Sequence, residues 1–280
     1  MTAPPHKLIP EPENDTPSGD LERGQLAKLD LIAKRARLTE GCRVLDVGCG
    51  WGSFAIHAAR KYGAQVVGLT ISENQKEVAE KRVEAAGLSH VVTILLVDYR
   101  AMPSSFHHSF DAVVAIGLLE HVGSEYMDGW FKILSWAMKP EDSVGVFVVT
   151  TVPDTHWEAY SKGSDFIQQY IFPGDKLSSV ATLVNSCTKA GLNINSLENL
   201  GPHYTRTVRE WRYRFQRNFE SHIKPALQLE YPSLADADIE IFRRKWIYYF
   251  VYCEAGFATS FLADHVFTVT REGNLRLVHS

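Results

Sequence analysis

The 280-residue sequence has little cysteine, no long hydrophobic run and no excess of basic charge. Its four cysteines are widely spaced without a CxxC pair, which argues against a disulfide scaffold or a zinc site. No apolar stretch approaches the roughly 20 residues that cross a bilayer, and the N-terminus lacks the apolar core of a signal peptide. A net charge of −4 removes the broad basic field that nucleic-acid binding uses. We therefore expect a cytoplasmic protein with no metal site and no nucleic-acid partner.

Short β-branched segments alternate with segments of helical spacing along the first half of the chain. Strands are expected over 43–50, 65–70, 91–98, 110–117 and 144–152. Helices are expected over 51–62, 72–86 and 120–138, with Ser72 as the N-cap of the second. Strands that alternate with helices predict a parallel sheet that is covered on both faces.

The two ends of the chain depart from this alternation. Five prolines among polar residues predict disorder over 1–20, and a helix follows over 21–37 with Asp20 as its N-cap. Beyond residue 153 we expect a helix over 177–190, strands over 192–200 and 263–271, and long helices over 205–228 and 236–257. About half of the aromatic residues lie between 200 and 270, which indicates a separate role for that part of the chain.

The first predicted strand ends in glycines, and the segment VLDVGCGWG contains three of them at its junction with the next helix. Glycine at a strand-to-helix turn permits positive φ and lets a ligand approach the backbone closely. The second strand ends at Thr70, where an NAD site would carry an acidic residue, and the third ends at Asp98 and Tyr99. An ordinary tight turn without a ligand is the alternative, but the three strand ends together resemble S-adenosylmethionine-dependent methyltransferases.

Five ordered segments resemble a narrower family: VLDVGCGWG, VVGLTISENQ, LLEHVG, GPHYTRTVREW and YYFVYCEAGF. They are similar to segments of the cyclopropane-fatty-acid synthases, and DFIQQYIFPG resembles the plant and fungal branch, so the resemblance covers about 21–271. It implies an α/β, doubly wound class I methyltransferase (Rossmann-like) fold, with a mostly parallel seven-stranded sheet and a helical substrate cap. The expected organisation is one methyltransferase domain over 21–280, with cap insertions at about 153–190 and 203–257.

The resemblance implies that cofactor-binding residues lie where the first four strands end. They are Asp46, Gly48, Gly50, Trp51, Gly52, Thr70, Gln75, Asp98, Tyr99 and Ile116. Asp46, Gly48 and Gly50 are expected at the methionine end of S-adenosylmethionine. Thr70 and Gln75, at and just beyond the end of the second strand, are expected at the ribose and adenosine side of S-adenosylmethionine. Asp98 and Tyr99 are expected beside the adenine.

The resemblance also places Glu120 and Tyr204 in the reaction chamber. In bacterial members an equivalent Glu and Tyr, with a His and a Cys, help to hold a bicarbonate ion. Such an ion suits cyclopropane formation, because ring closure requires a base that takes a proton from the transferred methyl group. His121 is a third catalytic candidate, as a general base or a cofactor contact, with a purely structural role as the alternative.

Two departures from the family leave the binding of bicarbonate open. Thr150 stands where the family carries a histidine after the fifth strand. Plant relatives also lack that histidine, so its absence does not by itself abolish activity. Residues 1–20 contain no counterpart of the Tyr-Ser-Cys-type segment that folds over the cofactor in bacterial members. Another segment then takes that role, or the acceptor differs, or the chain is incomplete.

The resemblance fixes the cofactor better than the acceptor. The first expectation is transfer of a methyl or methylene group to the double bond of an unsaturated fatty-acyl phospholipid. The alternatives are a C- or N-methyltransferase of a small-molecule natural product and a cofactor-binding protein without catalysis. The arginine-rich stretches at 206–217 and 243–245 either form a solvated helix face or attract anionic lipid headgroups. No stretch has the length and amphipathic pattern of a membrane anchor, so any membrane contact is expected to be peripheral. The oligomeric state is not predicted.

Overall fold

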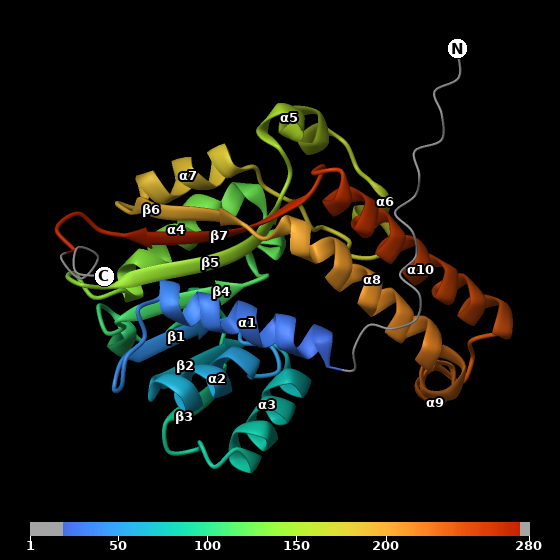
Figure 1. Ribbon diagram of the computed structural model, residues 1–280, viewed down its shortest axis with the longest axis horizontal. Coiled ribbons are helices and arrows are strands. Elements are labelled where there is room, and N and C mark those ends of the chain that lie inside the picture. The colour runs from blue at the N-terminus through green and yellow to red at the C-terminus, as the bar shows by residue number, and fades with distance from the viewer. Residues whose placement is uncertain (1–18, 275–280) are drawn as a thin grey trace.

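Seven strands form one sheet in the order β3-β2-β1-β4-β5-β7-β6 (Figure 1). The structure is a computed structural model that describes residues 19–274. The strands are β1 (Arg43–Val47), β2 (Gln65–Thr70), β3 (Val92–Leu96), β4 (Ala112–Ile116), β5 (Val144–Thr151), β6 (Asn193–Asn199) and β7 (Ala263–Thr270). β1 to β5 pair in parallel, whereas β7 runs antiparallel to both β5 and β6. The predicted doubly wound, mostly parallel sheet is confirmed.

Helices cover both faces of the sheet. They are α1 (Asp20–Arg35), α2 (Ser53–Tyr62), α3 (Glu73–Ala85), α4 (Met127–Ala137), α5 (Asp154–Lys162), α6 (Phe166–Tyr170), α7 (Val180–Lys189), α8 (Gly201–Asn218), α9 (Lys224–Glu230) and α10 (Asp236–Ala258). One face packs against α1, α2 and α3, and the other against α4 and α7. Alternate strand residues supply the two cores: Val44 and Val114 face the first, Leu45 and Val113 the second.

A pair of long helices extends from one end of the sheet (Figure 1). α8 and α10 pack along each other, and their contact buries Val208, Phe250, Cys253 and Phe257. α5 and α6 lie at the same end of the molecule, above the carboxyl ends of β4 and β5. The separate aromatic core of α8 and α10 explains why aromatic residues gather in this part of the sequence, since large side chains hold two helices together away from the sheet.

The helix predicted over 120–138 is wrong in its first half. Two short 3-10 turns, Leu119–His121 and Ser124–Tyr126, precede α4. Gly123 between them has a φ of 81°, which an α-helix cannot accommodate because its residues need negative φ. Glu120 therefore lies on a tight turn beside β4 rather than on a long helix.

Three other helices begin at residues that differ from those predicted. Asp20 is the first residue of α1 rather than its N-cap, and Gly19 precedes it. α2 begins at Ser53, because Gly52 has a φ of 76°. The helix predicted from residue 205 begins at Gly201, and a π-helical turn separates it from α9. Residues 1–18 of the segment predicted to be disordered lie outside the described residues.

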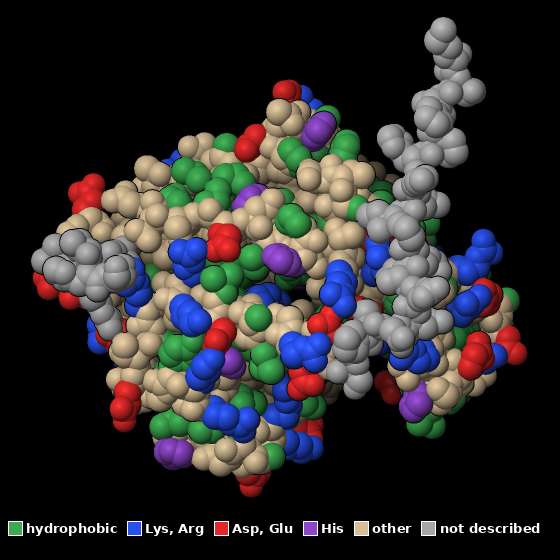
Figure 2. Space-filling view, in the orientation of Figure 1, with side chains coloured by type: hydrophobic (Ala, Val, Ile, Leu, Met, Phe, Trp, Pro, Cys, Tyr) green, Lys and Arg blue, Asp and Glu red, His purple; other side chains and the backbone are tan. Residues whose placement is uncertain are grey.

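Charged side chains of both signs are mixed over the face shown in Figure 2, which carries α1 and α8. Within residues 19–274, none of the helices has the length and apolar character needed to cross a membrane.

Candidate active site

Three glycines form the turn that joins β1 to α2. Gly48, Gly50 and Gly52 have φ values of 78°, 53° and 76°, a left-handed conformation that glycine adopts without strain. The amides of Gly48 and Cys49 donate to the carbonyl of Leu69 at 3.0 and 2.9 Å. The turn is therefore tied to the carboxyl end of β2, which fixes its shape.

Asp46 lies on β1 just before this turn and is only 1% exposed. Burial raises the pKa of its carboxyl to about 7. Its Oδ2 has no hydrogen-bond partner among the described residues, although buried acceptors normally have one. A Cβ added to Gly50 would meet no heavy atom within 4 Å. An unpartnered acceptor beside an open backbone turn fits the ammonium group expected at the methionine end of S-adenosylmethionine.

Thr70 and Gln75 form a polar pair after β2. Thr70 Oγ1 donates to Gln75 Oε1 at 2.8 Å. Ser72 caps α3 as predicted, because its Oγ accepts from the Gln75 amide at 3.3 Å. The cap fixes the backbone that carries Gln75, so the pair is held in place before any ligand binds. Its contact with the cofactor stays a prediction.

The residues after β3 lie at the edge of the same end of the sheet. Asp98 accepts from the amide of Arg100 at 2.8 Å and from its Nε at 2.9 Å. The Arg100 guanidinium holds the pKa of the Asp98 carboxyl below its usual range. Tyr99 packs, partly buried, against the core of the second face, and the Trp51 side chain is half exposed. Asp98 is thus an oriented carboxylate at a strand end.

A cavity of about 810 Å³ lies at the carboxyl ends of β4 and β5. Its walls come from the sheet and from α5, α6, α8 and α10. They are largely apolar and include Ile116, Val148, Val152, Tyr249, Phe257 and Leu262. Among the predicted cofactor-binding residues, Ile116 belongs to the described lining, whereas Asp46 and the glycine turn lie outside it. Ile116 therefore marks the border between the glycine turn and the cavity.

Five polar side chains on the cavity wall form a group, hereafter the polar cluster: Lys28, Glu120, Thr150, Tyr204 and Asp264. Glu120 Oε1 accepts from the Thr150 amide at 2.6 Å, and Thr150 Oγ1 donates to Asp264 Oδ1 at 3.3 Å. Lys28 Nζ donates to the Tyr204 hydroxyl at 3.4 Å. The predicted pair Glu120 and Tyr204 is thus brought together in one chamber. α1, a 3-10 turn, β5, α8 and β7 each contribute one side chain.

The two carboxyls of the polar cluster have raised pKa values. Burial, followed by the charge of Glu120, raises the pKa of Asp264 to about 7. Burial also raises the pKa of Glu120, against a hydrogen bond from the Thr150 amide. Burial lowers the pKa of the Lys28 ammonium, although Asp264 opposes this. Glu120 Oε2 and Asp264 Oδ2 have no hydrogen-bond partner in the described part of the chain, which is typical of a functional site.

Asp264→Asn is expected to increase stability at alkaline pH. The pKa of Asp264 is raised in the folded chain, so the wild type loses folding free energy as pH rises from the unfolded pKa of about 4 to about 7. A shift of this size corresponds to at most about 4 kcal/mol. We expect the free energy of unfolding to be about 2 to 4 kcal/mol higher in the variant near pH 8 and equal near pH 4. Urea unfolding across this range measures it, and a less stable variant near pH 8 would contradict the assignment.

His121 lies at the rim of the cavity rather than in the polar cluster. Its side chain is half exposed, and its Nδ1 lies 2.8 Å from Asp175 Oδ1. The ring packs edge-on against Phe172. The structure therefore holds His121 in one orientation beside the chamber, and its role in catalysis stays a prediction.

Sequence patterns did not single out Lys28, Asp175 or Asp264. Asp264 enters the chamber because β7 pairs antiparallel with β5, which places Asp264 opposite Thr150. The available signal was an acidic residue at an inward position of a strand whose other inward residues, Val266, Thr268 and Thr270, are uncharged. Lys28 gave no such signal, since lysine on an amphipathic helix is normally solvated.

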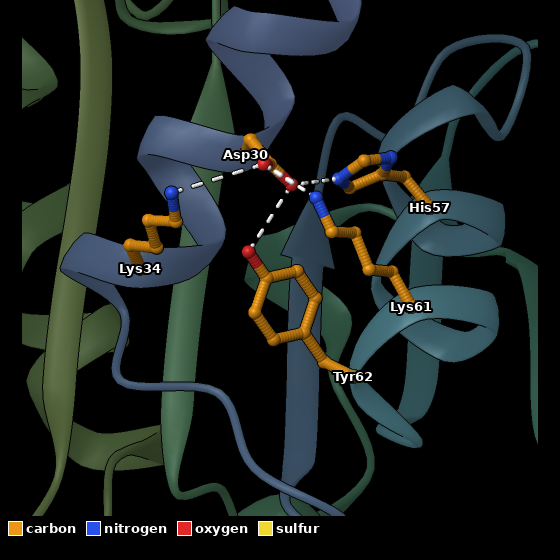
Figure 3. Close-up of polar contacts among 5 residues, drawn as sticks. All are labelled: Asp30, Lys34, His57, Lys61 and Tyr62. Atoms are coloured by element: carbon orange, nitrogen blue, oxygen red, sulfur yellow. Dashed lines mark hydrogen bonds and ion pairs between the residues drawn. The ribbon is translucent and has the colours of Figure 1, made fainter.

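Contacts of Asp30 on α1 with three side chains of α2 join the two helices, close in sequence to Lys28 (Figure 3). Asp30 accepts from Lys61 Nζ at 2.5 Å and from the Tyr62 hydroxyl at 3.1 Å, and His57 Nε2 lies 2.8 Å from its Oδ1. The partners from α2 hold the pKa of Asp30 below its usual range. α1 is therefore fixed on the sheet through α2, two residues beyond the point where Lys28 enters the cavity.

The strand order, the glycine turn and the antiparallel β7 define a class I methyltransferase fold. The cyclopropane synthase MmaA2 from Mycobacterium tuberculosis superposes with a TM-score of 0.76 at 25% identity, over 92% of this chain and 87% of that one. The mycolic acid cyclopropane synthase CmaA1, solved with SAH and CTAB, superposes with a TM-score of 0.75 at 27% identity, over 89% of this chain and 84% of that one.

The chain belongs to the mycolic acid cyclopropane synthetase family, whose model matches residues 14–266. The cyclopropane-fatty-acyl-phospholipid synthase of Escherichia coli (strain K12) is 35% identical over 243 residues, which cover 85% of this chain but 56% of that protein. The methoxy mycolic acid synthase MmaA3 of Mycobacterium tuberculosis is 30% identical over 262 residues, or 90% of this chain and 83% of that protein. The chain thus spans little more than half the length of the E. coli relative. The predicted resemblance is confirmed.

Proposed function

We propose that this chain is an S-adenosylmethionine-dependent methyltransferase that adds a methyl or methylene group to the double bond of an unsaturated fatty-acyl phospholipid. The observation that carries the proposal is an apolar cavity with two buried carboxyls on its wall. Apolar walls suit an acyl chain, and negative groups stabilise the positive charge that develops when an alkene takes up a methyl group. Relatives named as cyclopropane synthases support this acceptor.

The glycine turn and the strand ends beside it are the proposed cofactor site. Asp46, Gly48 and Gly50, with Thr70 and Gln75, would hold S-adenosylmethionine, which supplies an electrophilic methyl group when bound. The unpartnered Oδ2 of Asp46 and the open space at Gly50 support this placement. Trp51, Gly52, Asp98, Tyr99 and Ile116 complete the proposed set.

The walls of the cavity protect and stabilise a cationic acceptor. Glu120 lines the cavity, carries a buried, unpartnered carboxyl oxygen, and is the proposed electrostatic partner of the positive charge. Aromatic faces of Tyr204, Tyr249 and Phe257 line the same space and attract cations. The surrounding apolar surface excludes water, which would otherwise capture a carbocation. His121, held at the rim by Asp175, is proposed to act at the entrance.

A small-molecule amine is the second candidate acceptor. Glu120 and Asp264, in a cavity with aromatic walls, would also hold an ammonium group. N-methylation would use the same cofactor site and would need a base to remove the amine proton. The two acceptors therefore differ in the product rather than in the residues that are proposed to act.

Deuterium-labelled methionine separates the two acceptors. A host that expresses the chain is fed the labelled amino acid, and its lipids are analysed by mass spectrometry. We expect a labelled methylene group on unsaturated acyl chains, which is absent from a host that carries the empty vector. A labelled methyl branch instead of a ring would assign C-methylation. Unlabelled lipids, together with intact S-adenosylmethionine binding in calorimetry, would overturn the lipid assignment and favour the amine.

A phospholipid acceptor also implies contact with a membrane surface, which we propose to be peripheral. The arginine-rich stretch on α8 is partly neutralised, because Arg209 and Arg212 pair with Glu254 at 2.6 and 3.3 Å. The exposed side chains of Leu229 and Tyr231, at the end of α9, offer apolar surface for such a contact.

A further inference from the structure

Three donors of the polar cluster are already engaged within the cluster: the amide and hydroxyl of Thr150 and the ammonium group of Lys28. Thr150, which stands where the family carries a histidine, donates its amide to Glu120 and its hydroxyl to Asp264. Lys28 is the only cation of the cluster as defined here; its Nζ donates to the Tyr204 hydroxyl, and its charge interacts with Asp264. When Asp264 is ionised, as a base must be, a bicarbonate ion would add a second negative charge beside its unpartnered oxygen in an apolar cavity, where like charges repel strongly. The residues present do not fit a bound bicarbonate.

Asp264 lies in a position suited to the base that bicarbonate would otherwise supply. Asp264 lies on β7, is 3% exposed, and belongs to the lining of the cavity. Thr150 holds Oδ1, whereas Oδ2 has no hydrogen-bond partner among residues 19–274. A base must reach the proton that it removes and must keep a free lone pair for it. Asp264 Oδ2 has an unpartnered lone pair, and the Asp264 side chain forms part of the wall that a bound acceptor would contact.

We propose that Asp264 is the catalytic base that takes the proton released on ring closure, and that the chamber works without bicarbonate. The proposal rests on the proposed function. In this step a C–H bond of the newly transferred methyl group breaks. Its electron pair forms the second ring bond to the cationic carbon of the acceptor, and the proton passes to Asp264 Oδ2. Charge and atoms balance without a further reactant.

Several groups on other elements control the charge of Asp264. They are Glu120, Lys28, Tyr204 and Thr150. The first favours the protonated form of Asp264 and the other three favour the ionised form. His265, the next residue on β7, contacts Thr151 instead, at 2.8 Å. Because a base must be ionised, we expect the rate of cyclopropane formation to rise with pH through the pKa of Asp264, about 7, and then to level.

Bicarbonate binding is tested directly on the full chain. Carbon-13-labelled bicarbonate is titrated against the protein, with and without S-adenosylhomocysteine, and its NMR line width is followed. We expect no saturable binding in either state. Saturable binding to the wild type that competes with an acyl ligand would place the ion in the chamber and overturn the proposal. This readout does not depend on turnover.

Turnover of unsaturated phospholipid vesicles tests Asp264 itself. Asp264→Asn keeps the size of the side chain, and we expect the rate of cyclopropane formation to fall by about 100-fold or more. Asp264→Glu should restore part of the rate with a shifted pH profile. Thr268→Val is the matched control, because it removes another unpartnered buried polar group from β7 outside the cavity and should leave the rate unchanged.

The outcomes separate the two proposals. Product from the wild type together with a fully active, folded Asp264→Asn variant overturns the role of Asp264 alone. A wild-type rate that requires added bicarbonate overturns it as well. Absence of labelled product from the wild type, with S-adenosylmethionine bound, overturns the proposed lipid acceptor and with it the ring-closing step. Urea unfolding of each variant shows that a lost rate is not a lost fold.

Discussion

Glu120→Gln is expected to lower methyl transfer by about 10²- to 10³-fold. Glutamine keeps the size of the side chain and can still accept the hydrogen bond that the Thr150 amide donates at 2.6 Å. What it removes is the negative charge at the buried, unpartnered Oε2. In an apolar cavity that charge is weakly screened, so its loss raises the energy of a cationic acceptor more than it would in water. Release of S-adenosylhomocysteine with unsaturated phospholipid vesicles measures the effect.

A matched variant controls for the removal of an acidic side chain. Glu125 is exposed on the neighbouring 3-10 turn, Ser124–Tyr126, and lies outside the described cavity lining. Glu125→Gln should leave the rate unchanged, and both variants should bind S-adenosylmethionine as the wild type does. A wild-type rate for Glu120→Gln would remove Glu120 from the reaction and leave the chamber assignment without its main electrostatic group.

Gly50→Leu is expected to weaken S-adenosylmethionine binding by at least about 100-fold, or ~2.7 kcal/mol. Gly50 has a φ of 53°, and a Cβ there would project into space free of protein atoms within 4 Å. A leucine side chain would therefore occupy the space proposed for the cofactor rather than disturb the core. Calorimetric titration of the purified variant gives the affinity.

The control must reproduce the backbone strain without blocking the site. Gly87 lies in the turn after α3, has a φ of 71° and likewise meets no heavy atom within 4 Å of an added Cβ. A non-glycine residue in this conformation costs about 1–2 kcal/mol at either position. Gly87→Leu should lower stability to a similar extent but keep the affinity. Equal affinities for the two variants would place the cofactor elsewhere.

The sheet could be predicted from sequence because its signals are local. β-branched runs that end in glycine or polar residues mark β1, β2 and β4, and helical spacing marks α2 and α3. The segment before α4 was less predictable. Its apolar and acidic residues have helical spacing, but Gly123 adopts a φ of 81° and turns the chain. A single glycine in a helical pattern does not reveal whether its freedom is used.

The site was predictable only where a recognisable motif carries it. Glu120 and Tyr204 were named from the resemblance, and they do share a chamber. Lys28 and Asp264 were not named, because their position depends on the docking of α1 and on the register between β5 and β7. Pairing register and helix docking are long-range properties that no local pattern expresses.

The supports of the chamber fall into two sets that can vary independently. Glu120, Thr150 and Asp264 belong to the sheet and its adjoining turn, whereas much of the apolar wall comes from α8 and α10. Because the helix pair has its own aromatic core, substitutions along its inner surface can reshape the acceptor space without moving the carboxyls. This separation gives the scaffold evolvability: a lineage could change the molecule that it modifies while it retains the proposed acid–base chemistry, and a designer could do the same.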